Sequence, residues 1–241
     1  MDYINNITEG LVLANNEIAG NPWLESGATG DSINLGGMWL LGNSTGADKT
    51  IYVNYTTGND LTGDGTSGNP YKTITQALAA LPRVIDHIIT IQLQDADYVE
   101  NPNVKGFDGK GTIIIQGNTA TPVNTRIRGA TTIEANKCQI FINKLAARVA
   151  VNSGKSIAVL NNPGIVEIKD SVVNTWSASY TNTIAIYASK SPFVLSTNNS
   201  DNSVAATVGL QAEFGATIIK NGTQPGGATS NEVVNTGGLI R

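Results

Sequence analysis

Three glycines, Gly63, Gly65 and Gly68, form a G-x-G-x-x-G pattern between a strand-like run and a helix-like run. Such a loop can bind a phosphate when its backbone N–H groups and the start of the following helix point at the anion. In dinucleotide-binding folds the third glycine packs inside the opening helix. Here Asn-Pro-Tyr follows Gly68, and the helical pattern starts only at Thr73. The spacing indicates a structural loop, and we expect no nucleotide and no other cofactor.

Two carboxylates of the same loop, Asp60 and Asp64, have the alternating spacing of calcium-binding loops. A complete EF-hand loop carries a bidentate glutamate at its twelfth position, where this chain has Tyr71. The EF-hand is therefore excluded. A weak cation site at Asp60 and Asp64 is the metal-binding hypothesis that remains.

Two arginines, Arg126 and Arg128, alternate around Ile127 in the run TRIRG. In a strand this alternation places both guanidinium groups on the outer face, opposite Ile127. There they can hydrogen-bond a glycan or act as the base of a polysaccharide lyase, and the alternative is pairing with another subunit. His87, the only histidine, lies between the helix-like run and the next strand. We expect it to be a hydrogen-bonded boundary residue without a catalytic role.

A polar segment, NTWSASYTNT at residues 174–183, contains the aromatic residues Trp176 and Tyr180. Aromatic faces surrounded by Ser, Thr and Asn suit stacking on sugar rings with hydrogen bonds to the hydroxyl groups. The alternative is that these rings pack between subunits or against an adjacent coil. Trp176, Tyr180, Arg126 and Arg128 are the candidate glycan-binding or receptor-binding residues, and no catalytic residue is predicted.

The composition restricts the class of partner. The 241 residues carry a net charge of -4, with 14% charged residues, so nucleic-acid binding is not expected. No signal peptide and no apolar run long enough for a membrane span is visible, which predicts synthesis in a cytoplasm and no membrane insertion. Cys138 is the single cysteine, and we expect it to be buried and free of redox chemistry.

One helix is predicted, at residues 73–81. Thr73 with Gln76 three residues later has the spacing of a capping box, and Ile74 and Leu78 belong to its apolar stripe, which ends before Pro82. A strand at residues 50–56 precedes the glycine loop. Residues 1–48 are irregular and turn-rich, with tryptophans at 23 and 39, and are predicted to be a separate attachment segment.

From residue 87 onward, short strand-like runs alternate with Asn, Gly, Ser or Pro. The separations are too short for crossover helices, so a doubly wound α/β fold is excluded. Lys155 and Val159 match Lys190 and Val194 at an offset of 35 residues, and Leu195 matches residue 219 at an offset of 24. Such weak repeats predict an all-β solenoid of about five or six turns, with a β-sandwich as the competing architecture.

The strand, the run G-N-D-x-x-G-D-G-T-x-x-N-P-Y-K-T-I and the short helix together resemble the N-terminal cap of right-handed parallel β-helix proteins of the pectin-lyase-like type. This resemblance implies that residues 51–82 close the end of a β-helix formed by residues 49–241. In that cap Gly63, Gly65 and Gly68 allow sharp turns, Pro70 stiffens the entry, and Thr73, Ile74 and Leu78 form the helix that covers the core.

The C-terminal run from Ala216, ATIIKNGTQPGGATSNEVVNTGGLIR, is similar to the ends of tail and receptor-binding proteins from phages and prophages of Gram-positive bacteria. Residues 220–241 are predicted to be a closing segment. The resemblance implies a virion protein, a tail fibre or baseplate-associated protein that is a homotrimer and binds a bacterial surface polysaccharide. Residues 1–48 would attach it to other tail or baseplate proteins.

Two other functions remain open at this stage. Members of the β-helix family include polysaccharide lyases and hydrolases, so a depolymerase is the alternative to a binding protein. From Val149 onward, however, the acidic residues show no spacing that repeats across neighbouring coils, which favours binding without catalysis. A structural spacer that binds neither cells nor glycan is the third possibility.

Overall fold

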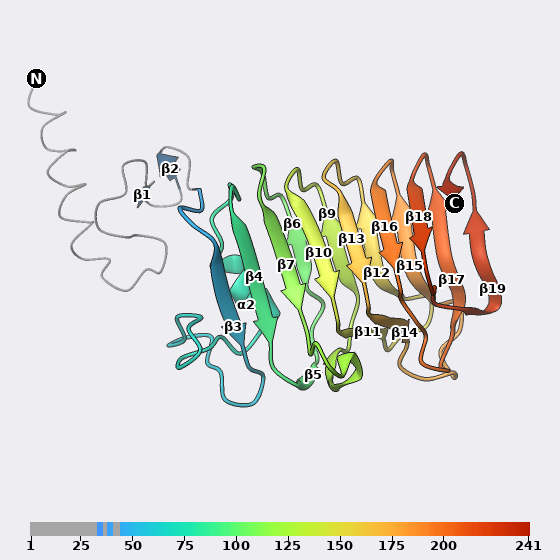
Figure 1. Ribbon diagram of the computed structural model, residues 1–241, viewed down its shortest axis with the longest axis horizontal. Helices are drawn as coiled ribbons and strands as arrows, with labels where there is room; N and C mark the ends of the chain where they lie inside the picture. The colour runs from blue at the N-terminus through green and yellow to red at the C-terminus, as the bar shows by residue number, and fades with distance from the viewer. Residues whose placement is uncertain (1–32, 36–37, 41–43) are drawn as a thin grey trace, which may run out of the picture.

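The computed structural model describes residues 33–35, 38–40 and 44–241. Every strand pair from β3 onward is parallel. The strands stack along the long axis of the molecule in chain order (Figure 1). The structure is therefore a parallel β-solenoid of about six turns, as predicted. A β-sandwich is excluded because its sheets are antiparallel.

The solenoid has three sheets, of eight, four and six strands, and the central coils contribute one strand to each. The eight-stranded sheet consists of β3 (Lys49–Val53), β4 (Ile88–Leu93), β7 (Thr112–Gln116), β10 (Gln139–Asn143), β13 (Val166–Lys169), β16 (Phe193–Thr197), β18 (Thr217–Asn221) and β20 (Leu239–Ile240). The four-stranded sheet consists of β5 (Ala96–Tyr98), β8 (Thr125–Ile127), β11 (Ala146–Val149) and β14 (Val172–Thr175). The six-stranded sheet consists of β6 (Asn103–Lys105), β9 (Thr131–Glu134), β12 (Lys155–Leu160), β15 (Ile184–Ser189), β17 (Ala206–Glu213) and β19 (Gly227–Val234). A short 3-10 helix, η1 (Pro122–Asn124), precedes β8.

The register corrects one of the predicted repeats. Leu195 lies beside Ile219, which confirms the offset of 24 residues. The offset of 35 residues is wrong, because Lys155 pairs with Ile184 at an offset of 29. Val194 instead pairs with Val166 in the eight-stranded sheet. Strands of two different sheets share the same alternation of apolar and polar residues, so letter matching alone confuses them.

Isoleucines stacked along the axis form the core of the solenoid. Each inward position of the eight-stranded sheet repeats in the next coil about 4.8 Å away, so identical side chains pack on one another. One such row passes through five coils and is at most 2% exposed: Ile51, Ile91, Ile115, Ile142 and Ile168. Burial on this scale is the main stabilising term of the fold.

Helix α2 (Ile74–Ala79) lies at the N-terminal end of the described coil, next to β3. Its residues Ile74 and Ala77 are fully buried, and Leu78 is 6% exposed. The Thr73 hydroxyl oxygen accepts a hydrogen bond from the Gln76 backbone N–H (3.0 Å), which is the first half of the predicted capping box. In a complete capping box the Gln76 side chain would accept a hydrogen bond from the Thr73 N–H. Here the Thr73 N–H donates to the carboxylate of Asp60 in the glycine loop instead (3.0 Å).

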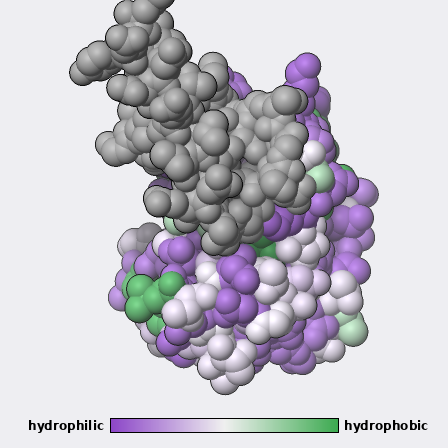
Figure 2. All heavy atoms as spheres, turned by 90° about the vertical axis from the view of Figure 1, so that its left-hand side faces the viewer, coloured by the Kyte–Doolittle hydropathy of each residue, from purple (hydrophilic) through white to green (hydrophobic). Residues whose placement is uncertain are grey.

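A carboxylate from the next coil also binds the start of α2. The Ile74 and Thr75 backbone N–H groups donate to the two oxygens of Glu100, each at 2.9 Å. A negative charge at this place satisfies otherwise unpaired N–H groups and is favoured by the helix dipole. Seen from this end, the described residues around the grey atoms are mainly hydrophilic or neutral (Figure 2). That α2 caps the solenoid core remains a prediction.

Two glycines of the loop lie too close to neighbouring atoms to carry a side chain. Gly65 has a φ of +78°, and a Cβ atom there would lie 2.9 Å from Ile51. A Cβ atom at Gly63 would lie 2.2 Å from the Asn59 carbonyl oxygen. Gly68 is different from the expectation, because a Cβ atom would meet nothing within 4 Å there. The predicted third glycine of the pattern therefore has no steric requirement to be glycine.

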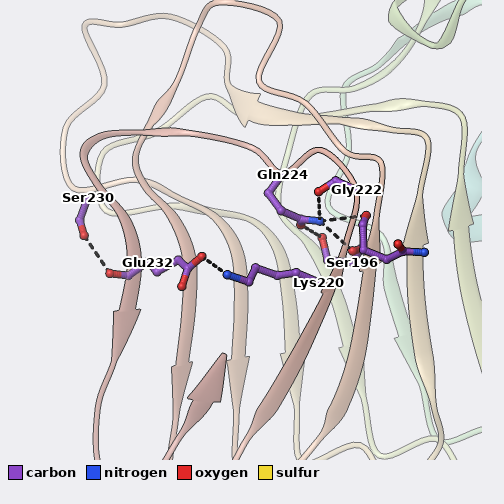
Figure 3. A network of polar contacts seen from close by, with 7 residues as sticks. Ser196, Lys220, Gly222, Gln224, Ser230 and Glu232 are labelled. Atoms are coloured by element: carbon purple, nitrogen blue, oxygen red, sulfur yellow. Dashed lines mark hydrogen bonds and ion pairs between the residues drawn. The ribbon is translucent and has the colours of Figure 1, made fainter. Parts of the chain in front are cut away.

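Polar residues occupy inward positions at the other end of the solenoid (Figure 3). Beyond Ile168 the isoleucine row continues as Ser196 and then Lys220. The Lys220 ammonium group pairs with Glu232, which follows Leu210 in the row of the six-stranded sheet. The Gln224 amide donates to the Ser196 carbonyl oxygen (2.9 Å). Within the predicted closing segment 220–241, charged and amide groups thus stand where earlier coils have apolar side chains.

Most of the predicted attachment segment lies outside the described residues. Two short strands within it, β1 (Ile33–Leu35) and β2 (Met38–Leu40), pair antiparallel. Thr45 is 2% exposed, and its N–H donates to the Val84 carbonyl oxygen (3.0 Å). The Asp48 carboxylate accepts a hydrogen bond from the Ile88 N–H (2.8 Å). Residues 44–48 therefore pack against the first coils.

Candidate functional site

The outer face of the four-stranded sheet gathers charged side chains from successive coils. Asp97 of β5 lies beside Arg126 of β8, which in turn lies beside Ala146 of β11. The same register carries Arg128, two residues after Arg126, toward Arg148 of β11. Ile127, between the two predicted arginines, is fully buried, so the alternation correctly places both arginines outside.

One carboxylate serves the first two arginines. The Arg126 Nε–H donates to Asp97 Oδ1, and Arg128 Nη1 lies 3.9 Å from Asp97 Oδ2. The side chains of Arg126 and Arg128 are 37% and 34% exposed. The two arginines therefore find a carboxylate partner within their own chain, whereas the alternative prediction paired them with another subunit. Both arginine side chains remain about one-third exposed.

Trp176, directly after β14, lies against Arg128 and Arg148. The guanidinium carbon of Arg128 lies 3.8 Å from the centroid of the indole ring, and that of Arg148 lies 5.9 Å from it. The ring therefore packs against adjacent coils, which is the second of the two predicted roles. Cation–π contacts of this kind hold a guanidinium group in a defined plane. The face of the ring covered by Arg128 is not available to a sugar.

Tyr180, the other aromatic residue of the loop, is half-buried. Its backbone N–H donates to the Ser177 carbonyl oxygen (3.1 Å) in the turn that joins β14 to β15. The structure thus brings together three of the four predicted glycan-binding residues, Trp176, Arg126 and Arg128. Tyr180 lies in the same loop as Trp176 but has no hydrogen bond or ion pair with these three residues in the described part of the chain.

Arg148 is the residue of this site that sequence reasoning missed. In the described part of the chain its guanidinium group has no carboxylate partner and donates no hydrogen bond, and its Nε atom is buried. Burial lowers the pKa of Arg148, the charge of Arg126 lowers it further, and Asp97 opposes the change. The signal in the sequence was the run AARV, in which Arg148 occupies an outward position like that of Arg128 in TRIRG.

The two loop carboxylates predicted as a weak cation site bind backbone groups. Asp60 accepts hydrogen bonds from the Lys72 and Thr73 N–H groups, and Asp64 accepts one from the Thr66 N–H (2.8 Å). Hydrogen bonds from Thr66 hold the pKa of the Asp64 carboxyl below its usual value. Among the described residues no group of three or more His, Cys, Asp or Glu side chains could hold a metal ion.

The single histidine and cysteine take the structural places expected of them. His87 Nδ1 lies 2.6 Å from the Thr45 carbonyl oxygen, and the His87 N–H donates to the Thr45 hydroxyl oxygen. Cys138 is 1% exposed, and burial raises the pKa of its thiol to about 12. Neither side chain takes part in the arginine cluster.

A polar cleft lies where the eight-stranded sheet turns into the four-stranded sheet. It has a volume of about 450 Å³ and is lined by amide, hydroxyl and carboxylate side chains that include Gln92, Gln94, Asp95 and Asn118. The Asp95 carboxylate is already bound by the Asn118 amide (2.9 Å) and the Thr125 hydroxyl (2.9 Å). Such groups suit hydrogen bonding to neutral hydroxyls, and the sequence analysis did not find this cleft.

The chain matches no protein family model, no curated protein and no solved structure. Across the residues that the structure describes, no helix is long and apolar enough to cross a membrane.

Proposed function

We propose that this protein is a tail fibre or baseplate-associated structural protein of a phage or phage-like particle, and that it binds a glycan on the surface of a bacterial host. The observation that carries the proposal is the cluster of Arg126, Arg128 and Trp176, which β8, β14 and the residues directly after them place on the outer face of a parallel solenoid. A solenoid presents side chains at a regular spacing along its axis, which suits contact with a linear polymer. The cap-like loop and the C-terminal run, similar to those of phage tail proteins, add the particle context.

We propose further that the outer face of the eight-stranded sheet is the surface for self-association, as a homotrimer. Its outward positions carry large apolar side chains in two adjacent rows, which polar residues interrupt. One row holds Ile88, Ile165, Phe193 and Leu239 with Thr112, Gln139 and Thr217 between them, and the other holds Ile114, Phe141, Leu195 and Ile219 with Glu167 between Phe141 and Leu195. Ile88, Ile165, Phe193 and Leu239 are 37–46% exposed. Large exposed apolar side chains gathered on one face are typical of a protein interface, and a second and third copy present the same surface in symmetric assemblies.

The test of self-association is the mass in solution. Light scattering should give about three times the 25.2 kDa chain mass, and Phe193→Glu should lower it toward a single chain because the new charge would be buried in the interface. Val151→Glu is the matched control, since Val151 is 58% exposed in the turn between β11 and β12. A single-chain mass for the unmodified protein would contradict the interface.

The test of glycan binding is cosedimentation of the purified protein with whole cells of a panel of Gram-positive bacteria. Binding to some strains, and competition by polysaccharide extracted from those strains, would support the proposal. Shortened polysaccharide chains after incubation would instead indicate a depolymerase. Failure to bind any strain, with a folded protein, would leave only the role of a spacer.

A further inference from the structure

Three guanidinium groups and one carboxylate share a small area of the outer face of the four-stranded sheet. Arg126, Arg128 and Arg148 supply three positive charges and Asp97 supplies one negative charge, so the cluster has an excess of two positive charges. An unbalanced cluster of this kind costs stability, because the like charges repel and water screens them less where they are partly buried. Its presence therefore needs an explanation beyond the fold.

Two of these guanidinium groups contain a buried N–H donor that has no hydrogen-bond acceptor within the described residues. The Nε atoms of Arg128 and Arg148 are both buried and have no hydrogen-bond partner among the described residues. Buried polar groups in proteins are hydrogen-bonded with few exceptions. Arg148 has no carboxylate partner at all in this part of the chain, whereas Arg126 donates its Nε–H to Asp97.

Trp176 sets the geometry of these donors. Its ring is covered by Arg128 at 3.8 Å and approached by Arg148 at 5.9 Å. Two arginines of adjacent coils are thus held against the same ring, which restricts their side-chain rotamers before any ligand arrives. A planar guanidinium fork held in this way matches the two oxygens of a carboxylate or a phosphate group.

We infer that Arg148, with Arg128 and Arg126, forms an anion-binding site for the charged groups of an acidic polysaccharide, with Trp176 as its positioning residue. This inference rests on the glycan-binding function proposed above and names the chemical class of the glycan. The anionic group is the carboxylate of a uronic acid or the phosphodiester of a teichoic-acid-like polymer, since both offer paired oxygens to the same fork.

The experiment measures binding of three purified polymers by isothermal titration calorimetry at low salt: oligogalacturonate, poly(glycerol phosphate) and neutral dextran. The unmodified protein should bind at least one acidic polymer and not dextran. Arg148→Gln should weaken that binding at least about tenfold, because it removes the guanidinium that has no carboxylate partner in the described part of the chain. Which of the two acidic polymers binds distinguishes the carboxylate from the phosphodiester.

Lys110→Gln is the matched control, since it removes the same charge from an exposed residue of the turn that precedes β7. It should change the affinity less than about twofold. Arg148→Gln should also leave the thermal unfolding midpoint unchanged or raise it, because it relieves the repulsion by Arg126 and the burial of a charge. A fall in the midpoint would contradict the view that Arg148 is held at a cost to stability, and would assign it a structural role.

Two results would overturn the inference. One is that the unmodified protein binds neither acidic polymer, and the other is that Arg148→Gln and Lys110→Gln weaken binding equally, as general charge attraction would. The whole-cell assay separates this from the proposed function. Cell binding that Arg148→Gln does not change would refute the anion site alone, and polymer binding that depends on Arg148 without any cell binding would refute the adhesive function alone.

Discussion

Replacing Ile74 with alanine tests whether helix α2 closes the solenoid. Ile74 is fully buried in the same core as Ile51 and Ile89 of the first two coils. The change Ile74→Ala removes three buried carbon atoms and leaves a cavity, which in well-packed cores costs about 2–5 kcal/mol. For a chain of this size each kcal/mol lowers the unfolding midpoint by about 2–4 °C. We therefore expect a decrease of at least about 4 °C.

The place of the loss is more informative than its size. In a solenoid each coil contacts only its neighbours, so a defect at one end loosens the coils nearest to it. Hydrogen exchange should accelerate first in β3, β4 and β5, and should stay slow in β13 and β16. Leu61→Ala is the control, since Leu61 belongs to the same loop region but is 94% exposed, and it should change the midpoint by less than about 1 °C.

Two outcomes would refute the capping role of α2. An unchanged midpoint in Ile74→Ala would mean that the helix does not support the core. Uniform acceleration of exchange across all coils would mean that the solenoid unfolds as one unit, with no separate closed end.

Three further predictions concern the interior and the C-terminal end. Asn136→Ala should lower the free energy of unfolding, measured by urea titration, by about 1–3 kcal/mol, because the buried Phe107 N–H loses its acceptor, Asn136 Oδ1 at 3.0 Å. An unchanged urea midpoint would contradict this. Burial raises the pKa of the Cys138 thiol from 9.0 to about 12, so iodoacetamide at pH 8.5 should alkylate the folded protein at least about a hundredfold more slowly than the protein in urea, and rapid alkylation of the folded protein would count against burial of Cys138. Because the pKa is higher in the folded state, the thiol's contribution to the free energy of unfolding is complete below pH 9 and is lost as the pH rises toward 12. Glu232→Gln should lower the free energy of unfolding in the same urea titration by less than about 1 kcal/mol, because the side chains of its ion pair are partly exposed to water, Glu232 by 39% and Lys220 by 30%. A larger loss would mean that this ion pair is a main support of the last coil.

Local patterns in the sequence determined the elements and the class of fold. The alternation in the run TRIRG predicts that Ile127 faces inward and that Arg126 and Arg128 face outward, and the structure confirms this, because Ile127 is fully buried and both arginine side chains are partly exposed. Short separations between strands excluded crossover helices, and the apolar spacing from Ile74 to Leu81 predicted a helix where α2 lies. These inferences succeed because they depend on the period of a strand or helix and not on what it packs against.

Tertiary structure alone decided which strands stack and which side chains meet. The repeats at Lys155 and Lys190 look alike in sequence but belong to different sheets, because paired strands from β4 onward are offset by 20 to 29 residues and the turns between them vary in length. The arginine cluster illustrates the same limit, since Asp97, Arg148 and Trp176 are separated by 51 and 28 positions along the chain and meet only when three further coils stack on β5. Stacking converts distance in the chain into a spacing of about 4.8 Å per coil, and no local pattern contains that conversion.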